Sequence, residues 1–426
     1  MFTRRRSTVL GSVVTGMATC LALSLTTSPA TAAPTPASAS PAFYVPPTSL
    51  PAPGSVVRTQ PSPLFLQIPG VANSFPGTGR RIMYTSTEVD GSRTAVTGTL
   101  INPSAAWTGR GARPTVVLAP GTIGQGDQCA PSKMFDFPVS VDLTKPTIGA
   151  NYEFLFAYLL LTQGVRVMLT DYIGLGTPGI HTYVNRLEEG HAVLDGARAA
   201  LAADKLPAGS PVGFWGYSQG GGASASAAEL ASGYAPELNV RGTYAGAPPA
   251  DLSKVVSAID GTSIAGAIGY AINGLVDRYP PLKTILGAET NATGRAALAA
   301  TSTQCIGDSV LQFGFHRTNE WIRSGKSLSQ VLAAHPEAQR VVDEQRIGTL
   351  KPNAPVLVDT GINDDVIPHG QVMQLVSDWR RQGANVTVIT DRTPAIFPKL
   401  AVNHVLPDLF AALPALQFIR GQFDRS

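Results

Sequence analysis

From residue 115 onward the sequence alternates between short apolar runs and longer segments with helical periodicity, and this alternation restricts the fold more than any other feature. The expected strands are 115–119, 165–170, 212–215, 240–244, 355–359 and 385–390, and the expected helices are 152–163, 185–202, 219–232 and 371–382. Buried strands that alternate with helices form a mostly parallel sheet covered on both faces. The sequence therefore predicts an α/β fold with a mostly parallel central sheet.

Two segments lie outside this alternation, one before it and one that interrupts it. Residues 81–89 and 94–101 read as antiparallel strands joined by a turn at Asp90-Gly91. Residues 251–352 are mainly helical in pattern, unusually apolar at 263–275, and too long for a loop. We expect this interval to be a helical cap, inserted between core segments 77–250 and 353–426. Structural helices with no part in a site are the alternative.

The N-terminal segment has the layout of a secretory signal peptide. Arginines at 4–6 precede an apolar run at about 9–25, and small residues follow at 28–32. We predict a signal peptide at 1–32 and secretion to the extracellular space; a membrane anchor and lipidation of Cys20 are the alternatives. Residues 33–76 are rich in proline, alanine and serine but include aromatic residues, which predicts an extended arm that partly packs on the core.

Charge and cysteine content narrow the partners and the compartment. The formal net charge is +3, and removal of the three N-terminal arginines leaves a formally neutral chain. A neutral chain has no electrostatic footprint for nucleic acid or for an anionic membrane surface, so uncharged substrates are favoured. Cleavage also removes Cys20, leaving Cys129 and Cys305 in an oxidising compartment. This predicts one disulfide, with two unpaired buried thiols as the alternative.

The motif Gly-Tyr-Ser-Gln-Gly at residues 216–220 is the strongest chemical signal in the chain. It follows an expected strand and precedes an expected helix, the setting in which a serine nucleophile sits on a sharp turn. Gly216 and Gly220 lack the Cβ atoms that would clash at such a turn. Ser218 is therefore the predicted nucleophile, against the alternative of a glycine-rich turn.

A serine needs a base and an orienting acid, which follow it in the chain order serine, acid, histidine. Only His369 and His404 follow the best acid, and His404 lies beyond the last expected strand, where the base should be; His369 reads as a surface or capping residue. Asp364 is the predicted acid, and its neighbour Asp365 is expected to be solvated. The weaker acid candidates are Asp359 and Asp391.

An oxyanion hole requires backbone N–H groups, one of which normally belongs to the residue after the nucleophile. That residue is Gln219, and the second donor is expected at Gly121 or Thr122, with Asp127 orienting the loop. No cluster of histidine, cysteine and carboxylate residues has metal-ligand spacing, so neither a metal nor a cofactor is predicted.

The order of these features resembles the secretory lipase family, whose members include fungal lipase A and actinobacterial relatives. The resemblance rests on residues 43–47, 53–58, 121–124, 127–132, 171–176 and 216–220, with Cys305, Asp364 and His404. It implies an α/β-hydrolase fold with a helical cap and the hydrolysis of carboxylic esters, often triacylglycerols. Fungal members have an acidic residue near the oxyanion loop, whereas residues 121–124 here are Gly-Thr-Ile-Gly, which leaves the second donor open.

The sequence thus predicts a secreted serine esterase or lipase that works through an acyl-enzyme on a lipid or small ester. A serine peptidase or an acyltransferase of the same fold is the alternative, because the triad does not specify ester or amide; a non-catalytic binding protein is a third. A lipid–water interface is an open setting, while nucleic acid and a stable membrane anchor are not expected. Residues 264–275 are expected to line the acyl site, and a bond from Cys129 to Cys305 would tie the cap to the catalytic face.

Overall fold

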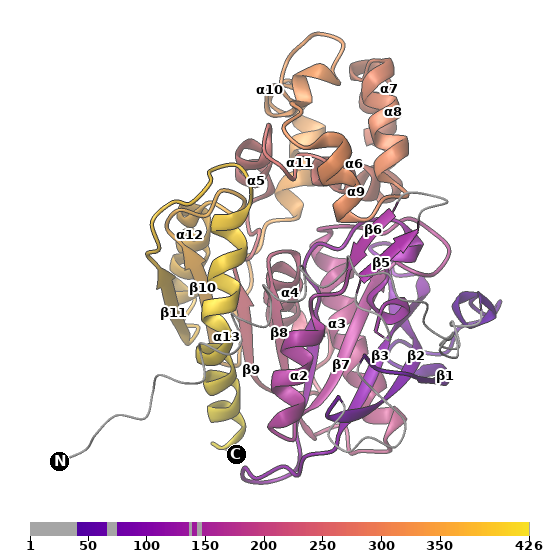
Figure 1. Cartoon of the computed structure of the whole chain (residues 1–426), viewed down its shortest axis with the longest axis vertical. Coiled ribbons are helices and arrows are strands. Elements are labelled where there is room, and N and C mark those ends of the chain that lie inside the picture. Colours follow the sequence, from indigo (N-terminus) through magenta and orange to yellow (C-terminus); the bar gives the residue numbers. More distant parts are fainter. Residues whose placement is uncertain (1–40, 66–74, 136–138, 143–146, 426) are drawn as a thin grey trace, which may run out of the picture. The chain divides into compact units, whose positions relative to one another are not determined.

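A nine-stranded sheet runs through the centre of the molecule (Figure 1). The structure is a computed structural model that describes residues 41–65, 75–135, 139–142 and 147–425. In spatial order the strands are β1 (Val56–Ser62), β2 (Gly77–Thr87), β3 (Arg93–Pro103), β7 (Arg166–Ile173), β4 (Thr115–Ala119), β8 (Pro211–Tyr217), β9 (Asn239–Gly246), β10 (Val356–Gly361) and β11 (Val386–Asp391). Pairs from β1 to β7 are antiparallel, and every later pair is parallel. The predicted antiparallel start and mostly parallel sheet are confirmed.

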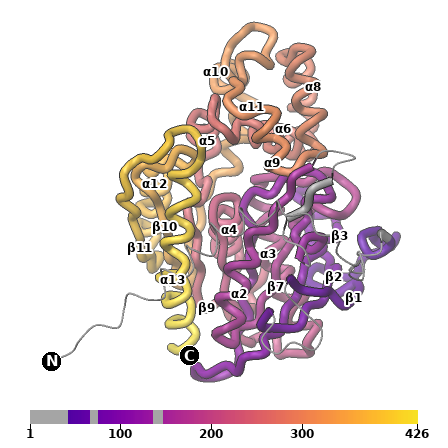
Figure 2. The backbone as a smooth tube through the Cα atoms, viewed as in Figure 1, coloured from indigo at the N-terminus to yellow at the C-terminus, as the bar shows by residue number. Residues whose placement is uncertain are grey.

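Helices cover both faces of the sheet, which explains why its central strands are apolar along their whole length. One face carries α3 (Arg186–Ala203) and α4 (Gln219–Tyr234), and the other carries α2 (Phe154–Thr162) and α13 (Val402–Phe423). The remaining helix of the core is α12 (His369–Arg381). Although α2 and α13 are far apart in sequence, they lie side by side in Figure 2, and residues of the two helices are in contact.

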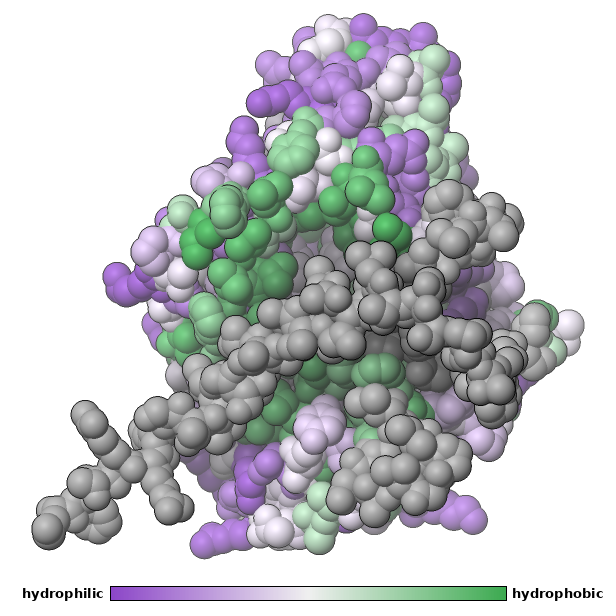
Figure 3. Space-filling model, viewed as in Figure 1, coloured by the Kyte–Doolittle hydropathy of each residue, from purple (hydrophilic) through white to green (hydrophobic). Residues whose placement is uncertain are grey.

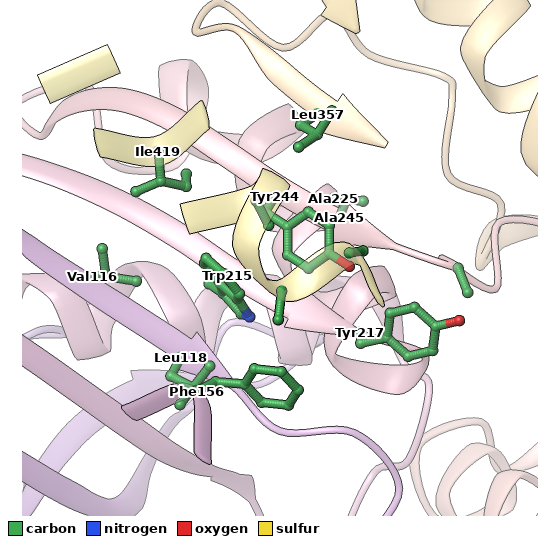
Figure 4. Close-up of a cluster of buried hydrophobic side chains, with 14 of the residues drawn as sticks. Val116, Leu118, Phe156, Trp215, Tyr217, Ala225, Tyr244, Ala245, Leu357 and Ile419 are labelled. Carbon is green, nitrogen blue, oxygen red and sulfur yellow. The ribbon is translucent and has the colours of Figure 1, made fainter. Parts of the chain in front are cut away.

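Alternate residues of β4 divide between the two cores, as the two-residue period of a strand requires. Val116 and Leu118 join the cluster that contains Phe156 of α2 and Ile419 of α13 (Figure 4). Val117 and Ala119, on the opposite face of the strand, join the cluster under α3 and α4. The sheet is thus buried on both faces, and its carboxyl edge is held in a fixed position.

The interval between β9 and β10 is helical, as expected, and lies beyond the carboxyl ends of the parallel strands (Figure 1). Its α-helices are α5 (Leu252–Ile259), α6 (Ala267–Arg278), α7 (Pro281–Glu289), α8 (Ala292–Thr301), α9 (Ile306–Phe313), α10 (Leu328–Ala334) and α11 (Pro336–Glu344). We call residues 251–352 the cap. Residues 39–426 form one unit by their contacts, so the cap is continuous with the core. The predicted boundaries of the cap at 250 and 352 therefore stay a prediction from the sequence.

The predicted signal peptide, 1–32, lies outside the described residues, as does part of the predicted arm at 33–76. In the described part of the arm, Phe43 and Tyr44 are buried against Met83 and Ala95. The arm also supplies β1, an edge strand that the sequence analysis did not predict and that accommodates Pro61 because one side of an edge strand needs no partner. A second unpredicted feature is the hairpin of β5 (Val139–Asp142) and β6 (Thr147–Ala150).

Candidate active site

Ser218 occupies a strained turn between β8 and α4. Its backbone angles are φ 57° and ψ −122°, a conformation that residues with a side chain rarely adopt. A Cβ on Gly216 would lie 2.2 Å from the carbonyl oxygen of Gly220, and a Cβ on Gly220 would lie 2.0 Å from the carbonyl oxygen of Ala119. Both glycines are therefore required for α4 to start so close to β4 and β8, and this close approach fixes the position of Ser218.

Asp364, in the loop after β10, meets His404, in the first turn of α13. Asp364 Oδ1 accepts hydrogen bonds from the backbone N–H groups of Val366 and Ile367, at 2.9 and 2.8 Å. Its Oδ2 accepts from His404 Nδ1 at 2.8 Å. Because Nδ1 carries the proton in this arrangement, Nε2 has a free lone pair. Nε2 is buried and has no hydrogen-bond partner among the residues that the structure describes.

The neighbours of this pair hold it in place. Tyr217 Oη donates to the carbonyl oxygen of His404 at 2.7 Å, which fixes the first turn of α13. Asp365, expected to be solvated, is half-buried and accepts from the N–H of Ala401 at 3.3 Å. His369 begins α12 and pairs through Nδ1 with Thr360 Oγ1 at 3.1 Å, apart from the Asp364 carboxylate.

Two adjacent residues just before α2 hold the loop after β4. Glu153 Oε1 accepts from the N–H of Gly121 at 2.8 Å, and Tyr152 Oη donates to the carbonyl oxygen of Thr122 at 3.3 Å. The Gly121 N–H is thus already engaged, which leaves Thr122 as the donor candidate on this loop. The hydroxyl of Thr122 hydrogen-bonds to that of Tyr183 at 2.7 Å. Asp127, the residue expected to orient the loop, accepts from the N–H of Gly176 at 2.9 Å.

Gln219 begins α4, and the N–H groups in the first turn of a helix have no acceptor within that helix. Its side chain is anchored, because Nε2 donates to Glu189 Oε1 at 2.8 Å and to His181 Nε2 at 3.0 Å. His181 Nδ1 in turn donates to the carbonyl oxygen of Ile173 at 3.1 Å. Burial lowers the pKa of His181 to about 4, so this imidazole is neutral and accepts as described.

Several buried carboxyl groups surround the site; of these only Asp359 was named from the sequence, as a weaker acid candidate. Burial raises the pKa of Glu153 to about 8 and that of Glu189 to about 8. Burial likewise raises the pKa of Asp359 to about 7 and that of Asp408 well above its ordinary value. The only sequence signal for Glu153 is an acid directly before the apolar run of α2.

An apolar cavity lies between Ser218 and the cap. Its lining includes Thr122, Tyr183, Ser218 and Gln219 from the core, and it extends along α5, α6, α7 and α10. Six residues of the segment expected to line the acyl site are among them: Ile264, Ala267, Ile268, Ala271, Ile272 and Leu275. Among the described residues no group of three or more histidine, cysteine or acidic side chains is placed to hold a metal ion.

The predicted disulfide is confirmed. Cys129 and Cys305 are bonded, with their Cα atoms 5.5 Å apart. The neighbouring Gly124 forms an antiparallel bridge with Cys305, so the loop after β4 and the start of α9 are joined by backbone and side chain. The cap is also joined to α3, because Arg278 Nε of α6 donates to Glu188 Oε1 at 2.7 Å.

Comparison with known proteins decides the family. The secretory lipase model matches residues 139–426, about two thirds of the chain. The chain belongs to the secretory lipase family. Lipases hydrolyse lipid esters, so membership places the chain among the carboxylic-ester hydrolases, as predicted. The match begins after the loop that contains Gly121 and Thr122, so it does not cover the proposed oxyanion donor on that loop.

Relatives occur in bacteria and fungi. A protein of Mycobacterium tuberculosis named as a probable inactive lipase is 28% identical over 82% of this chain and 76% of its own length. Lipase A of Moesziomyces aphidis is 27% identical over 69% of this chain, and Lipase 4 of Candida albicans is 30% identical over 70%. The aligned parts cover 66% and 62% of those two fungal proteins.

Solved structures agree on the fold. Candida antarctica lipase A in its closed state has a TM-score of 0.76 at 23% identity, covering 90% of this chain and 85% of that one. The likeness shows the α/β-hydrolase fold that the resemblance implied. The predicted family and fold are both confirmed, and the family is one named for secretion.

Proposed function

We propose that this protein is an exported serine hydrolase of fatty-acyl esters that works through an acyl-enzyme on Ser218. One observation carries the proposal. The strained turn holds Ser218 in the lining of an apolar cavity that is formed largely by residues of the cap. A mostly apolar cavity with few polar groups fits an acyl chain better than a peptide backbone, whose N–H and C=O groups need many partners.

In the proposed reaction, Ser218 Oγ attacks the ester carbonyl carbon while His404 Nε2 takes the hydroxyl proton. Asp364 holds the ring and stabilises the imidazolium that forms. The backbone N–H groups of Gln219 and Thr122 are the proposed donors to the negatively charged oxygen. The alcohol then leaves with the proton from His404, and a water molecule, deprotonated by the same nitrogen, hydrolyses the acyl-enzyme.

The composition of the cavity separates this proposal from a peptidase of the same fold. A panel of p-nitrophenyl esters of increasing acyl length, run beside aminoacyl amides, tests the choice directly. We expect ester hydrolysis with a preference for longer acyl chains and no amide hydrolysis. Faster cleavage of the amides would assign the site to a peptidase, and transfer of the acyl group to added alcohols in preference to water would indicate an acyltransferase.

Export is part of the proposal and rests on the sequence of residues 1–32 together with the secretory family. Several relatives from Malassezia are named secreted triacylglycerol lipases. We expect the mature protein to begin at Ala33, which intact-mass measurement of protein collected from the medium would show. A full-length mass in the cell fraction would contradict cleavage and export.

A further inference from the structure

The outer face of α13 and the loop before it expose large apolar side chains. Fourteen large hydrophobic residues of the described chain are exposed, and six of them define what we call the α13 patch. They are Phe397, Leu400, Val405, Leu409, Phe410 and Leu413. Three of these residues, Val405, Leu409 and Leu413, are spaced four apart and therefore share one helix face. Hydrophobic residues gather on the side of Figure 3 where α13 lies in Figure 1.

The outer face of this helix departs from the arrangement expected of a surface helix in water. A helix on the surface of a soluble protein turns its polar face outward, but α13 buries Asp408 and Asn403 and exposes Leu409 and Phe410. By length and composition α13 could cross a membrane, yet half of its most apolar window is buried against the sheet. An apolar outer face on an anchored helix is suited to lying in a lipid surface and not to crossing one.

The exposed charged residues of the segment that carries the α13 patch are basic. Between residues 392 and 419 the basic residues Arg392 and Lys399 are exposed, whereas the only acidic residue, Asp408, is buried. An apolar surface edged by exposed cations complements a lipid layer that carries carboxylates. Ester hydrolysis produces such a layer, because each turnover releases a fatty acid.

The patch is continuous with the proposed site. Val405 follows His404 in the chain, so one helix turn presents the base inward and an apolar residue outward. The loop before α13 contacts the cap, because the N–H of Ser263 donates to the carbonyl oxygen of Lys399 at 2.8 Å. The next cap residue, Ile264, lines the cavity. A lipid surface on the patch would therefore lie beside the edge of the cavity.

We propose that the α13 patch is the surface through which the protein binds a lipid–water interface, with Arg392 and Lys399 facing fatty-acid carboxylates. The choice of lipid rests on the proposed ester hydrolysis. Binding itself is separable from catalysis, because every patch residue is exposed whereas His404 is buried.

The test is cosedimentation of the mature chain, carrying Ser218→Ala to keep the lipid intact, with phosphatidylcholine vesicles containing oleic acid. Leu413→Asp is the test variant and Leu350→Asp its matched control, since the two leucines are 49% and 44% exposed. Leu350 is adjacent to Glu229 of α4, which packs on the sheet face opposite α13. Phe397→Ser is a second variant, located in the loop and not in the helix.

We expect Leu413→Asp and Phe397→Ser each to weaken vesicle binding roughly tenfold or more, and Leu350→Asp to leave it unchanged. When Leu413→Asp and Phe397→Ser are made in the protein that keeps Ser218, its Tm and its hydrolysis of a soluble short-chain ester should be unchanged. Equal binding by Leu413→Asp and Leu350→Asp would overturn the proposal. If the protein forms a dimer without lipid and Leu413→Asp dissociates it, the patch is a self-association surface. If vesicle binding appears only after residues 33–40 are removed, the patch is the binding surface of the arm. If the wild-type protein hydrolyses no ester but its vesicle binding still depends on the patch, only the proposed reaction is overturned.

Discussion

Replacing Glu153 by glutamine should make the protein more stable at alkaline pH while leaving its stability at acidic pH nearly unchanged. Glu153 is only 2% exposed, and burial raises its pKa from 4.5 to about 8. Its Oε1 accepts the Gly121 N–H, a bond that an amide oxygen also accepts. The substitution therefore removes the ionisation and keeps the contact.

The sign follows from proton binding. Because the pKa is higher in the folded state, the folded protein holds this proton between pH 4.5 and about 8 while the unfolded chain releases it. The stability associated with the neutral carboxyl is fully present below pH 4.5 and declines as pH rises to about 8. At about 1.4 kcal/mol per pKa unit, the decline is on the order of 5 kcal/mol.

Urea unfolding of the wild type and Glu153→Gln at pH 4.5 and pH 8.5 measures this difference. We expect nearly equal free energies of unfolding at the lower pH and a clear gain for Glu153→Gln at the higher one. Glu337→Gln is the control, because Glu337 is exposed and its backbone hydrogen bond lowers its pKa. If the gain from Glu153→Gln is the same at both pH values, the buried ionisation is not its source.

The remaining predictions concern the loop, the triad, the cavity and the disulfide. Glu153→Ala should reduce kcat with little change in KM, because it frees the Gly121 N–H and loosens Thr122. Glu153→Gln keeps the hydrogen bond and should preserve kcat; a reduced kcat in Glu153→Gln would refute this positioning role. Asp364→Asn should reduce kcat by roughly 10⁴-fold, and Asp365→Asn only mildly; equal losses in steady-state kinetics would remove the assigned acid. Ala271→Trp should shift the acyl-length profile toward short p-nitrophenyl esters, since Ala271 lines the cavity; an unchanged profile would place the acyl chain elsewhere. The Cys129→Ser and Cys305→Ser double variant should lose about 2–5 kcal/mol of stability in urea unfolding, and an unchanged midpoint would show that the bond contributes nothing.

Much of this architecture was predictable from the sequence because local patterns specify it. A strand, a glycine-flanked serine and a small-residue helix predict a sharp strand-to-helix turn at 216–220, and the predicted order of Ser218, Asp364 and His404 follows from that fold. The pairing of Cys129 with Cys305 followed once the signal peptide was set aside. Each of these predictions needed only the residues next to one another in the chain or the number of cysteines.

Features that depend on distant packing could not be predicted. The sequence favoured Gly121 and Thr122 equally as donors to the oxyanion. Only the position of α2 in the fold shows that the Gly121 N–H donates to Glu153 instead. The burial of Glu189 and Asp408 depends likewise on which helices meet in space. The apolar outer face of α13 was also missed, because an apolar helix near the C-terminus could equally have been buried on all sides.

The most direct test of the central claim is intact-mass and peptide analysis after treatment with a long-chain fluorophosphonate, which forms a stable adduct with an activated serine. The relative named as a probable inactive lipase shows why chemistry, and not family alone, must decide. We predict one adduct, located at Ser218, that is absent from Ser218→Ala and strongly slowed in His404→Ala. An adduct at another serine, or none in the folded wild-type protein, would contradict the proposed catalytic site.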